Sequence, residues 1–132
     1  MIYPSTKAGI AQLVGLANFI DEGSNNATFV FYSDSKPSNV SVNADDATKL
    51  ITLTLPKPCI KQTNDDSIDL QPTDTAIATQ AGTAKWARLF NGNGIAVADF
   101  EVGTDITLAN ADIAEGGTLS LTSFKLRPYI KE

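Results

Sequence analysis

The sequence predicts a mainly β protein, an antiparallel β-sandwich or jelly-roll-like fold, with one N-terminal α-helix. In residues 82–102, two strand-like runs flank Asn-Gly-Asn-Gly at 91–94, and Asn-Gly tolerates the positive φ angles of tight hairpins. Short runs rich in β-branched and aromatic residues recur between turn residues over 27–127. Only 5–22 shows helical apolar spacing. Residues 1–132 are therefore expected to form one domain, with the β-sandwich following the helix.

The predicted helix covers residues 5–21. Ser5 can cap it by accepting a hydrogen bond from a backbone N–H of the first turn. Gly23 follows as a stop signal. The apolar stripe has spacings of three and four and consists of Ile10, Leu13, Val14, Ala17 and Ile20. This stripe can cover a sheet edge, one mouth of the sandwich or a neighbouring subunit, and the sequence leaves that choice open.

Residues 27–32 form the first predicted strand. Its two phenylalanines share one face, while Val30 and Tyr32 share the other, so both faces are apolar. A strand that is apolar on both faces is expected to be central in its sheet. The polar, proline-containing segment 33–46 is predicted to be an excursion loop, and 50–55 the second strand.

The last predicted strand carries a change of face. Leu119 and Leu121 share one side, whereas Phe124 and Leu126 lie on the other. The switch near Ser123 indicates a bulge or a strand that changes its packing partner. The other expected elements are a polar, turn-rich segment at 61–73 with a short strand at 68–70, a short strand at 74–79, hairpin strands at 84–90 and 95–102, a brief strand at 105–108, a turn at 114–117 and the last strand at 118–126.

Charge and hydropathy exclude several classes of function. The net charge is −5 and the 10 basic residues are scattered, which argues against nucleic acid as a partner. No apolar run approaches the ~20 residues that cross a membrane. The run at 9–20 contains polar residues and lacks a small-residue cleavage site, so a signal peptide is not expected.

The side-chain inventory is poor for catalysis. The chain has no histidine, which excludes Ser-His-Asp and Cys-His arrangements, and it has a single cysteine, Cys59, which excludes a thiolate cluster and an intramolecular disulfide. Cys59 is expected to be a small buried apolar residue. The acidic pairs at 45–46 and 65–66 are expected to be solvated turn residues, with calcium binding the minor alternative. We expect no catalytic residue, no cofactor and no metal site, and therefore no enzyme.

Trp86 and Arg88 lie two residues apart on one face of a predicted strand. One interpretation is a core tryptophan with the arginine stem packed beside it. The other is an interface anchor, because Trp, Tyr and Arg dominate binding hot spots. The turn asparagines and the tyrosines near the termini are further contact candidates, so the expected interface residues are Trp86, Arg88, Tyr3, Tyr129, Asn91 and Asn93.

Residues 82–90, Gly-Thr-Ala-Lys-Trp-Ala-Arg-Leu-Phe, followed by Gly94, resemble a block found in small virion proteins of tailed bacteriophages and prophages. The similarity extends along most of the chain in the same block order. The other blocks are the acidic-glycine step at 21–23, the Ser-x-x-x-Pro loop at 33–37, the Leu/Thr strand before proline at 50–56 and the Gly-Gly-x-x-x-Leu-x-Ser-Phe type strand at 116–126. Cys59 is not part of the pattern.

The resemblance implies a virion component, made in the cytoplasm of the bacterial host, which binds itself and a phage capsid or tail protein. A capsid decoration (cement) protein is the expected type, and the local symmetry of a shell favours a trimer. A tail accessory protein is one alternative. A carbohydrate-binding or host-adhesion β-sandwich module is another, and an enzyme with a carboxylate-only or calcium-assisted site is the third.

Overall fold

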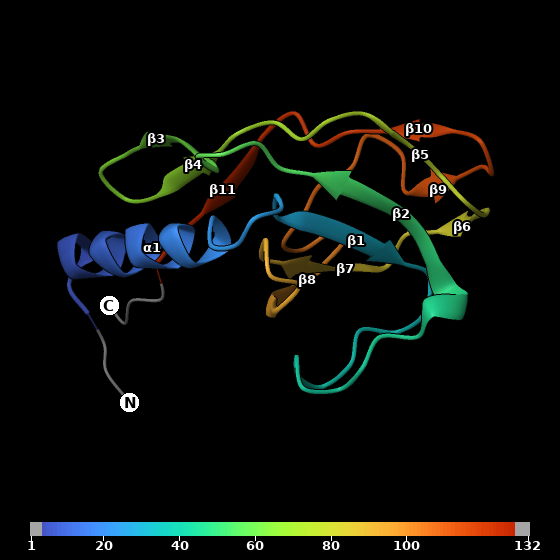
Figure 1. Cartoon of the computed structure of the whole chain (residues 1–132), viewed down its shortest axis with the longest axis horizontal. Coiled ribbons are helices and arrows are strands. Elements are labelled where there is room, and N and C mark those ends of the chain that lie inside the picture. The colour runs from blue at the N-terminus through green and yellow to red at the C-terminus, as the bar shows by residue number, and fades with distance from the viewer. Residues whose placement is uncertain (1–3, 129–132) are drawn as a thin grey trace.

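A computed structural model describes residues 4–128 of the chain. The fold is mainly β, its sheets are antiparallel, and one helix lies near the N-terminus, as the sequence predicts (Figure 1). The elements in chain order are α1 (Thr6–Ile20), β1 (Thr28–Tyr32), a 3-10 helix (Asp46–Thr48), β2 (Lys49–Thr54), β3 (Ile60–Thr63), β4 (Ile68–Leu70), β5 (Ala76–Ile77), β6 (Gly82–Thr83), β7 (Trp86–Phe90), β8 (Ala96–Glu101), β9 (Asp112–Ile113), β10 (Thr118–Leu119) and β11 (Phe124–Leu126).

The largest sheet has four strands in the order β2-β1-β7-β8. β1 lies between β2 and β7, which confirms the central position predicted from its two apolar faces. Across the sheet, Phe29 is opposite both Leu53 and Leu89, and all three side chains are buried in the main core. We call the face that carries these residues the inner face and the opposite one the outer face.

Three smaller sheets form a second layer, so the arrangement is sandwich-like (Figure 1). One contains β11-β4-β3, one pairs β10 with β5, and one pairs β6 with β9. The segment predicted as one strand at 118–126 is divided between two of them, because β10 pairs with β5 and β11 pairs with β4. The change of partner expected near Ser123 is therefore confirmed.

Helix α1 packs on the core of its own chain. Ser5 caps it, since its hydroxyl oxygen accepts a hydrogen bond from the Ala8 N–H at 3.2 Å. Ala17 and Ile20 are fully buried in the main core, and Ile10 and Leu13 of the same stripe are half-buried and pack against it. The helix contacts β4 in the small three-stranded sheet.

The Asn-Gly turn between β7 and β8 is joined to the end of this helix. The Asn91 side chain donates from Nδ2 to the Phe19 carbonyl at 3.3 Å and accepts from the N–H groups of Asn93 and Ile95 at 3.0 Å. The backbone approaches so closely that a Cβ on Gly92 would lie 2.1 Å from the carbonyl oxygen of Asn25. The predicted hairpin is present, and its turn also anchors the end of the helix to the sheet.

Three local predictions differ from the structure. Strands β6 and β9 pair with each other, although both lie outside the strands expected at 84–90 and 105–108. Residues 61–63 belong to the segment 61–73, expected to be polar and turn-rich, but in the structure they are part of edge strand β3. Their polar side chains do not signal a strand, and it is the pairing with β4 that forms it. Residues 105–108, expected to be a strand, contain only an isolated bridge between Ile106 and Val102, because the Asp105 N–H closes a turn onto the Glu101 carbonyl.

Cys59 is fully buried, as predicted. Its N–H donates to the carboxylate of Asp21 at 3.0 Å, and its thiol donates to the Ala17 carbonyl at 3.6 Å. Burial raises the pKa of this thiol to about 12, so it stays protonated near neutral pH.

Candidate functional site

The outer face of the four-stranded sheet carries a second, smaller apolar cluster. Val30, Tyr32 and Trp86 are its buried members, and Phe90 and Ala44 pack against them. Ala44 belongs to the 33–46 loop. The small sheets lie on one side of the four-stranded sheet, and this loop projects from the other side (Figure 1). The loop therefore covers part of a face that would otherwise expose aromatic side chains. We call residues 33–46 the anchored loop.

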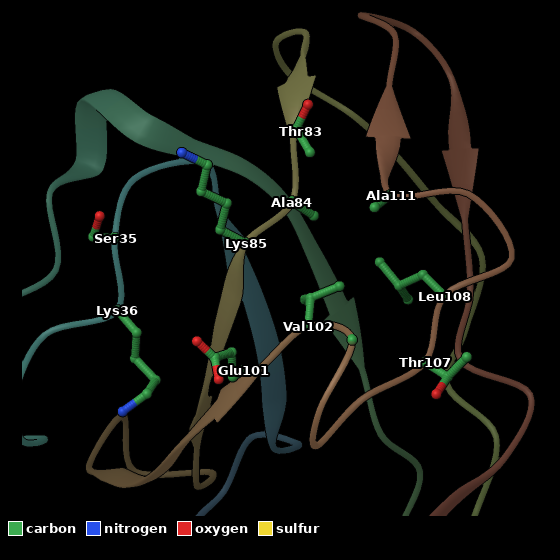
Figure 2. A pocket seen from close by; sticks show the side chains of 11 residues that line it. Ser35, Lys36, Thr83, Ala84, Lys85, Glu101, Val102, Thr107, Leu108 and Ala111 are labelled. Atoms are coloured by element: carbon green, nitrogen blue, oxygen red, sulfur yellow. The ribbon is translucent and has the colours of Figure 1, made fainter.

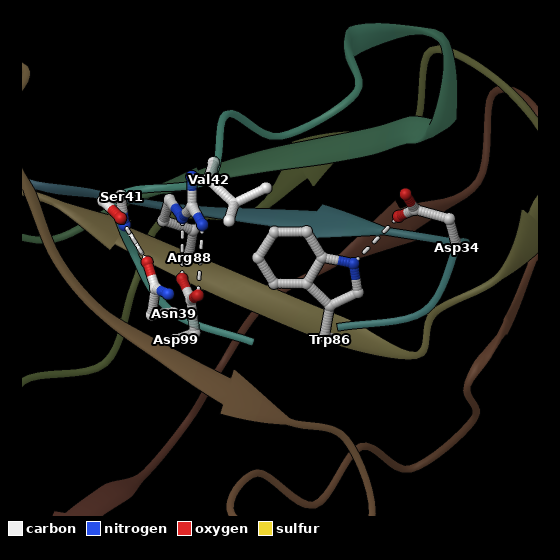
Figure 3. Close-up of polar contacts among 7 residues, drawn as sticks. All are labelled: Asp34, Asn39, Ser41, Val42, Trp86, Arg88 and Asp99. Carbon is white, nitrogen blue, oxygen red and sulfur yellow. Dashed lines mark hydrogen bonds and ion pairs between the residues drawn. The ribbon is translucent and has the colours of Figure 1, made fainter. Parts of the chain in front are cut away.

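A buried ion pair holds the tip of the anchored loop (Figure 3). Arg88 of β7 lies opposite Asp99 of β8 in the sheet register. Its Nε and Nη2 donate to the two carboxylate oxygens of Asp99 at 2.7 and 3.1 Å, and Nη1 donates to the Val42 carbonyl at 2.7 Å. The two charged side chains are only 4% and 6% exposed. These hydrogen bonds with Asp99 raise the pKa of Arg88 further above its ordinary value, so the guanidinium remains charged.

Trp86 holds the other end of the loop. Its indole Nε1 donates to Asp34 Oδ1 at 2.9 Å, as drawn in Figure 3. Its ring stacks on Tyr32 with centroids 4.5 Å apart, and the guanidinium carbon of Arg88 lies 5.2 Å from its centroid. Two neighbouring residues of one face of β7 thus fix Asp34 and Val42, eight positions apart in the loop.

The tip of the anchored loop presents two apolar side chains to solvent. Val40 and Val42 are 40% and 44% exposed. The backbone between them is shaped locally, because the Ser41 N–H donates to the Asn39 side-chain oxygen at 2.9 Å. The result is a fixed, partly apolar surface on the outer side of the four-stranded sheet, held by the bond from Arg88 to the Val42 carbonyl.

The predicted interface residues have different environments. Trp86 and Arg88 are buried at 1% and 3% exposure, as the core interpretation expects, and Asn91 is buried at 3%. Asn93 is exposed. Tyr3 and Tyr129 lie outside the described residues. Contact of any of these six residues with a partner stays a prediction.

The sequence analysis did not identify the residues that Trp86 and Arg88 contact. Trp86 contacts Asp34, and Arg88 contacts Asp99 and Val42. Asp99 is an ordinary acidic residue in a predicted strand, and no local signal places it opposite Arg88. The loop residues lie more than 40 positions before the β7 residues that they contact. Only the fold of the loop across the outer face reveals these contacts.

An open groove of about 660 Å³ lies at the C-terminal end of β8 (Figure 2). Lys36 and Lys85 border it on one side, Leu108 on the other, and Glu101 lies between them. In the part of the chain that the structure describes, the ion pairs are Arg88–Asp99 and Lys125–Asp69, so Glu101 forms none.

Comparison with protein-family models, with curated proteins and with solved structures found no match to this chain. Within residues 4–128, no group of three or more acidic or cysteine side chains is arranged to hold a metal ion. None of the described helices has the length and apolar character to span a membrane.

Proposed function

We propose that this chain is a phage or prophage structural protein that acts by binding proteins, both itself and a virion surface, and that it is of the capsid decoration type. The observation that carries the proposal is the construction of the anchored loop. A buried arginine, a buried tryptophan and two carboxylates hold it in place, and two valines remain exposed at its tip. Fixing a surface in advance lowers the entropic cost of binding.

The resemblance of the chain to small virion proteins supports the same proposal. A decoration protein would stabilise an assembled lattice by mass action, because it binds the assembled form and not its separated parts. A closed homo-oligomer, with a trimer favoured, fits the local symmetry of a shell. The tail surface of a virion is the alternative location for the same kind of protein.

The carbohydrate-binding alternative is less well supported. Such modules use exposed aromatic rings as platforms for sugars. Trp86 and Tyr32 are 1% and 2% exposed, and their rings stack on each other beneath the anchored loop. A glycan array tests this alternative directly, and specific binding to a glycan would favour it over the virion proposal.

Two measurements test the proposal. The mass of the protein in solution, from sedimentation equilibrium or light scattering, is expected to show a closed oligomer. Antibody detection is then expected to find the chain in virus particles purified from the source cells. A monomer at all concentrations that is also absent from particles would overturn the proposal.

A further inference from the structure

The turn between β7 and β8 contains two reactive dipeptides that the proposed function does not use. Asparagine followed by glycine occurs twice in the chain, at 91–92 and at 93–94. In such a dipeptide the glycine nitrogen can attack the side-chain amide carbon of the asparagine, because glycine has no Cβ to obstruct the approach. The structure places the two asparagines of this one turn in very different surroundings.

Asn91 lies in a closed environment and is 3% exposed. Its Nδ2 donates to the Phe19 carbonyl at 3.3 Å, and its Oδ1 accepts from the N–H groups of Asn93 and Ile95 at 3.0 Å. The next residue is packed as well, since a Cβ on Gly92 would clash with the backbone that follows α1. Attack on the Asn91 amide would therefore have to break three hydrogen bonds inside a buried site.

Asn93 is exposed, and so is Gly94. No hydrogen bond of the Asn93 side chain is found among residues 4–128, and its Oδ1 lies 2.7 Å from the position that a Cβ on Gly23 would take. The Gly94 N–H donates to the Asn91 carbonyl at 2.9 Å. Gly94 has a φ of 79°, and a Cβ placed on it would meet nothing within 4 Å. The nitrogen of Gly94 therefore has to release one turn hydrogen bond, at the surface, before it can attack.

We propose that Asn93 is a site of spontaneous covalent modification. The Gly94 nitrogen attacks its Cγ and converts the asparagine to aspartyl and isoaspartyl residues, while Asn91 in the same turn is protected. The inference goes beyond the proposed function and does not depend on it.

The reaction balances with water as its one co-reactant. The bond from the Gly94 nitrogen to Asn93 Cγ forms, the Cγ–Nδ2 bond breaks, and Nδ2 leaves as ammonia with the proton that Gly94 loses. Water then opens the cyclic imide. Opening at Cγ gives an aspartyl residue, whereas opening at the main-chain carbonyl carbon gives an isoaspartyl residue, whose main chain runs through Cβ and Cγ. One water is consumed and one ammonia is released.

The two products affect the turn differently. Both add a negative charge to a chain whose net charge is −5, but the aspartyl product keeps the original backbone. In the isoaspartyl product the extra main-chain atom lies between the N–H groups of residues 93 and 95, which both donate to Asn91 Oδ1. The two hydrogen bonds cannot both be kept when this spacing grows, so the contact of Asn91 with the end of α1 weakens.

Incubation at mildly alkaline pH, followed by peptide mapping with mass spectrometry, tests the proposal. The folded protein is compared with the chain unfolded in guanidinium chloride and with the peptide acetyl-Phe-Asn-Gly-Asn-Gly-Ile-amide. In the unfolded chain and in the peptide, the two asparagines should react at similar rates. In the folded protein, Asn93 should react about fivefold more slowly than in the peptide, because one hydrogen bond must open, and Asn91 more than about 100-fold more slowly, because three must.

Two variants of equal charge separate the positions. Asn93→Asp supplies the aspartyl product and should keep the melting temperature of the wild type within about 2 °C, because the backbone is unchanged. Asn91→Asp removes the Nδ2 donor and places a carboxylate against the Phe19 carbonyl, so it should lower the melting temperature by roughly 4 °C or more. In an aged sample, the isoaspartyl fraction, identified by enzymatic methylation, should exchange the Ile95 amide on the order of tenfold faster.

Two results would overturn the inference. Equal rates at Asn91 and Asn93 in the folded protein would mean that the fold does not distinguish them. An Asn93 that stays intact while the unfolded chain reacts to completion would mean that the turn protects both asparagines. Unchanged exchange at Ile95 in the isoaspartyl fraction would refute the expected effect on the turn. None of these results bears on oligomer formation or on the presence of the chain in particles, so the proposed function is tested separately.

Discussion

Substitution of Asp99 by alanine should be among the most destabilising single changes in this chain. The variant leaves the Arg88 guanidinium buried at 4% side-chain exposure, with the Val42 carbonyl as its one hydrogen-bond partner among the described residues. Removing one partner of a buried ion pair typically costs about 3–5 kcal/mol, because the other charge stays desolvated. That is a large share of the ~5–15 kcal/mol that holds a domain of this size folded.

Urea unfolding followed by circular dichroism and by the fluorescence of the single tryptophan measures this loss. The exposed ion pair provides a matched control. Lys125 and Asp69 are 3.8 Å apart, with side chains 43% and 31% exposed, so Asp69→Ala should cost less than about 1 kcal/mol. If Asp99→Ala costs no more than Asp69→Ala, the ion pair with Arg88 does not have the energetic role inferred from its burial.

A double variant separates the stability of the sheet from the position of the loop. Arg88→Met together with Asp99→Leu replaces the buried charges by apolar groups, which is often neutral or stabilising. Most of the stability lost in Asp99→Ala should therefore return. The Val42 carbonyl still lacks its donor, so the anchored loop should exchange its amides faster and be cleaved sooner by protease. A loop as protected as in the wild type would show that Arg88 is not what holds it.

Three further predictions concern other parts of the structure. Trp86→Ala should lower the free energy of unfolding by about 3–5 kcal/mol in the same urea assay, since the ring is buried, and a small loss would contradict the core assignment. Gly92→Ala should lower the free energy of unfolding by about 1–3 kcal/mol, because the new Cβ meets a carbonyl oxygen at 2.1 Å. Gly15→Ala has nothing within 4 Å of the new Cβ and should raise it by about 0.5–1 kcal/mol, so equal changes in the two variants would refute the contact at Gly92. Burial raises the Cys59 pKa from 9.0 to about 12, so above pH 9 the unfolded chain loses this proton first and the folded state loses stability. Between pH 8 and pH 10 the wild type should lose about 1 kcal/mol more than Cys59→Ala, and parallel pH curves would argue against the shift.

Local sequence patterns were sufficient for the elements whose own residues determine them. The helix cap at Ser5, the two apolar faces of β1 and the Asn-Gly turn each rest on neighbouring residues, and the structure contains all three. The switch of face near Ser123 correctly indicated that one stretch of chain serves two sheets. In each case the residues of the segment itself already carry the information.

The candidate site could not be derived in the same way. Asp99 lies opposite Arg88 only because the hairpin register shifts between Leu89 and Phe90, and nothing in the local residues signals that shift. Strand β3 was missed for a related reason, since an edge strand with a polar exterior has little apolar alternation. The course of the 33–46 loop depends on contacts with residues far along the chain, which a pattern of neighbours does not encode.

The tight packing of the Asn-Gly turn affects where a label can be attached to this protein. Hairpin turns are common places for an epitope or fluorophore, but an insertion at Gly92 would push apart the backbone contact that fixes the helix. The turn at residues 114–117 is better suited, because Glu115 and Gly116 are exposed and a Cβ on Gly116 would meet nothing within 4 Å. A tag placed there would report on the location of the protein while leaving the joint between helix and sheet untouched.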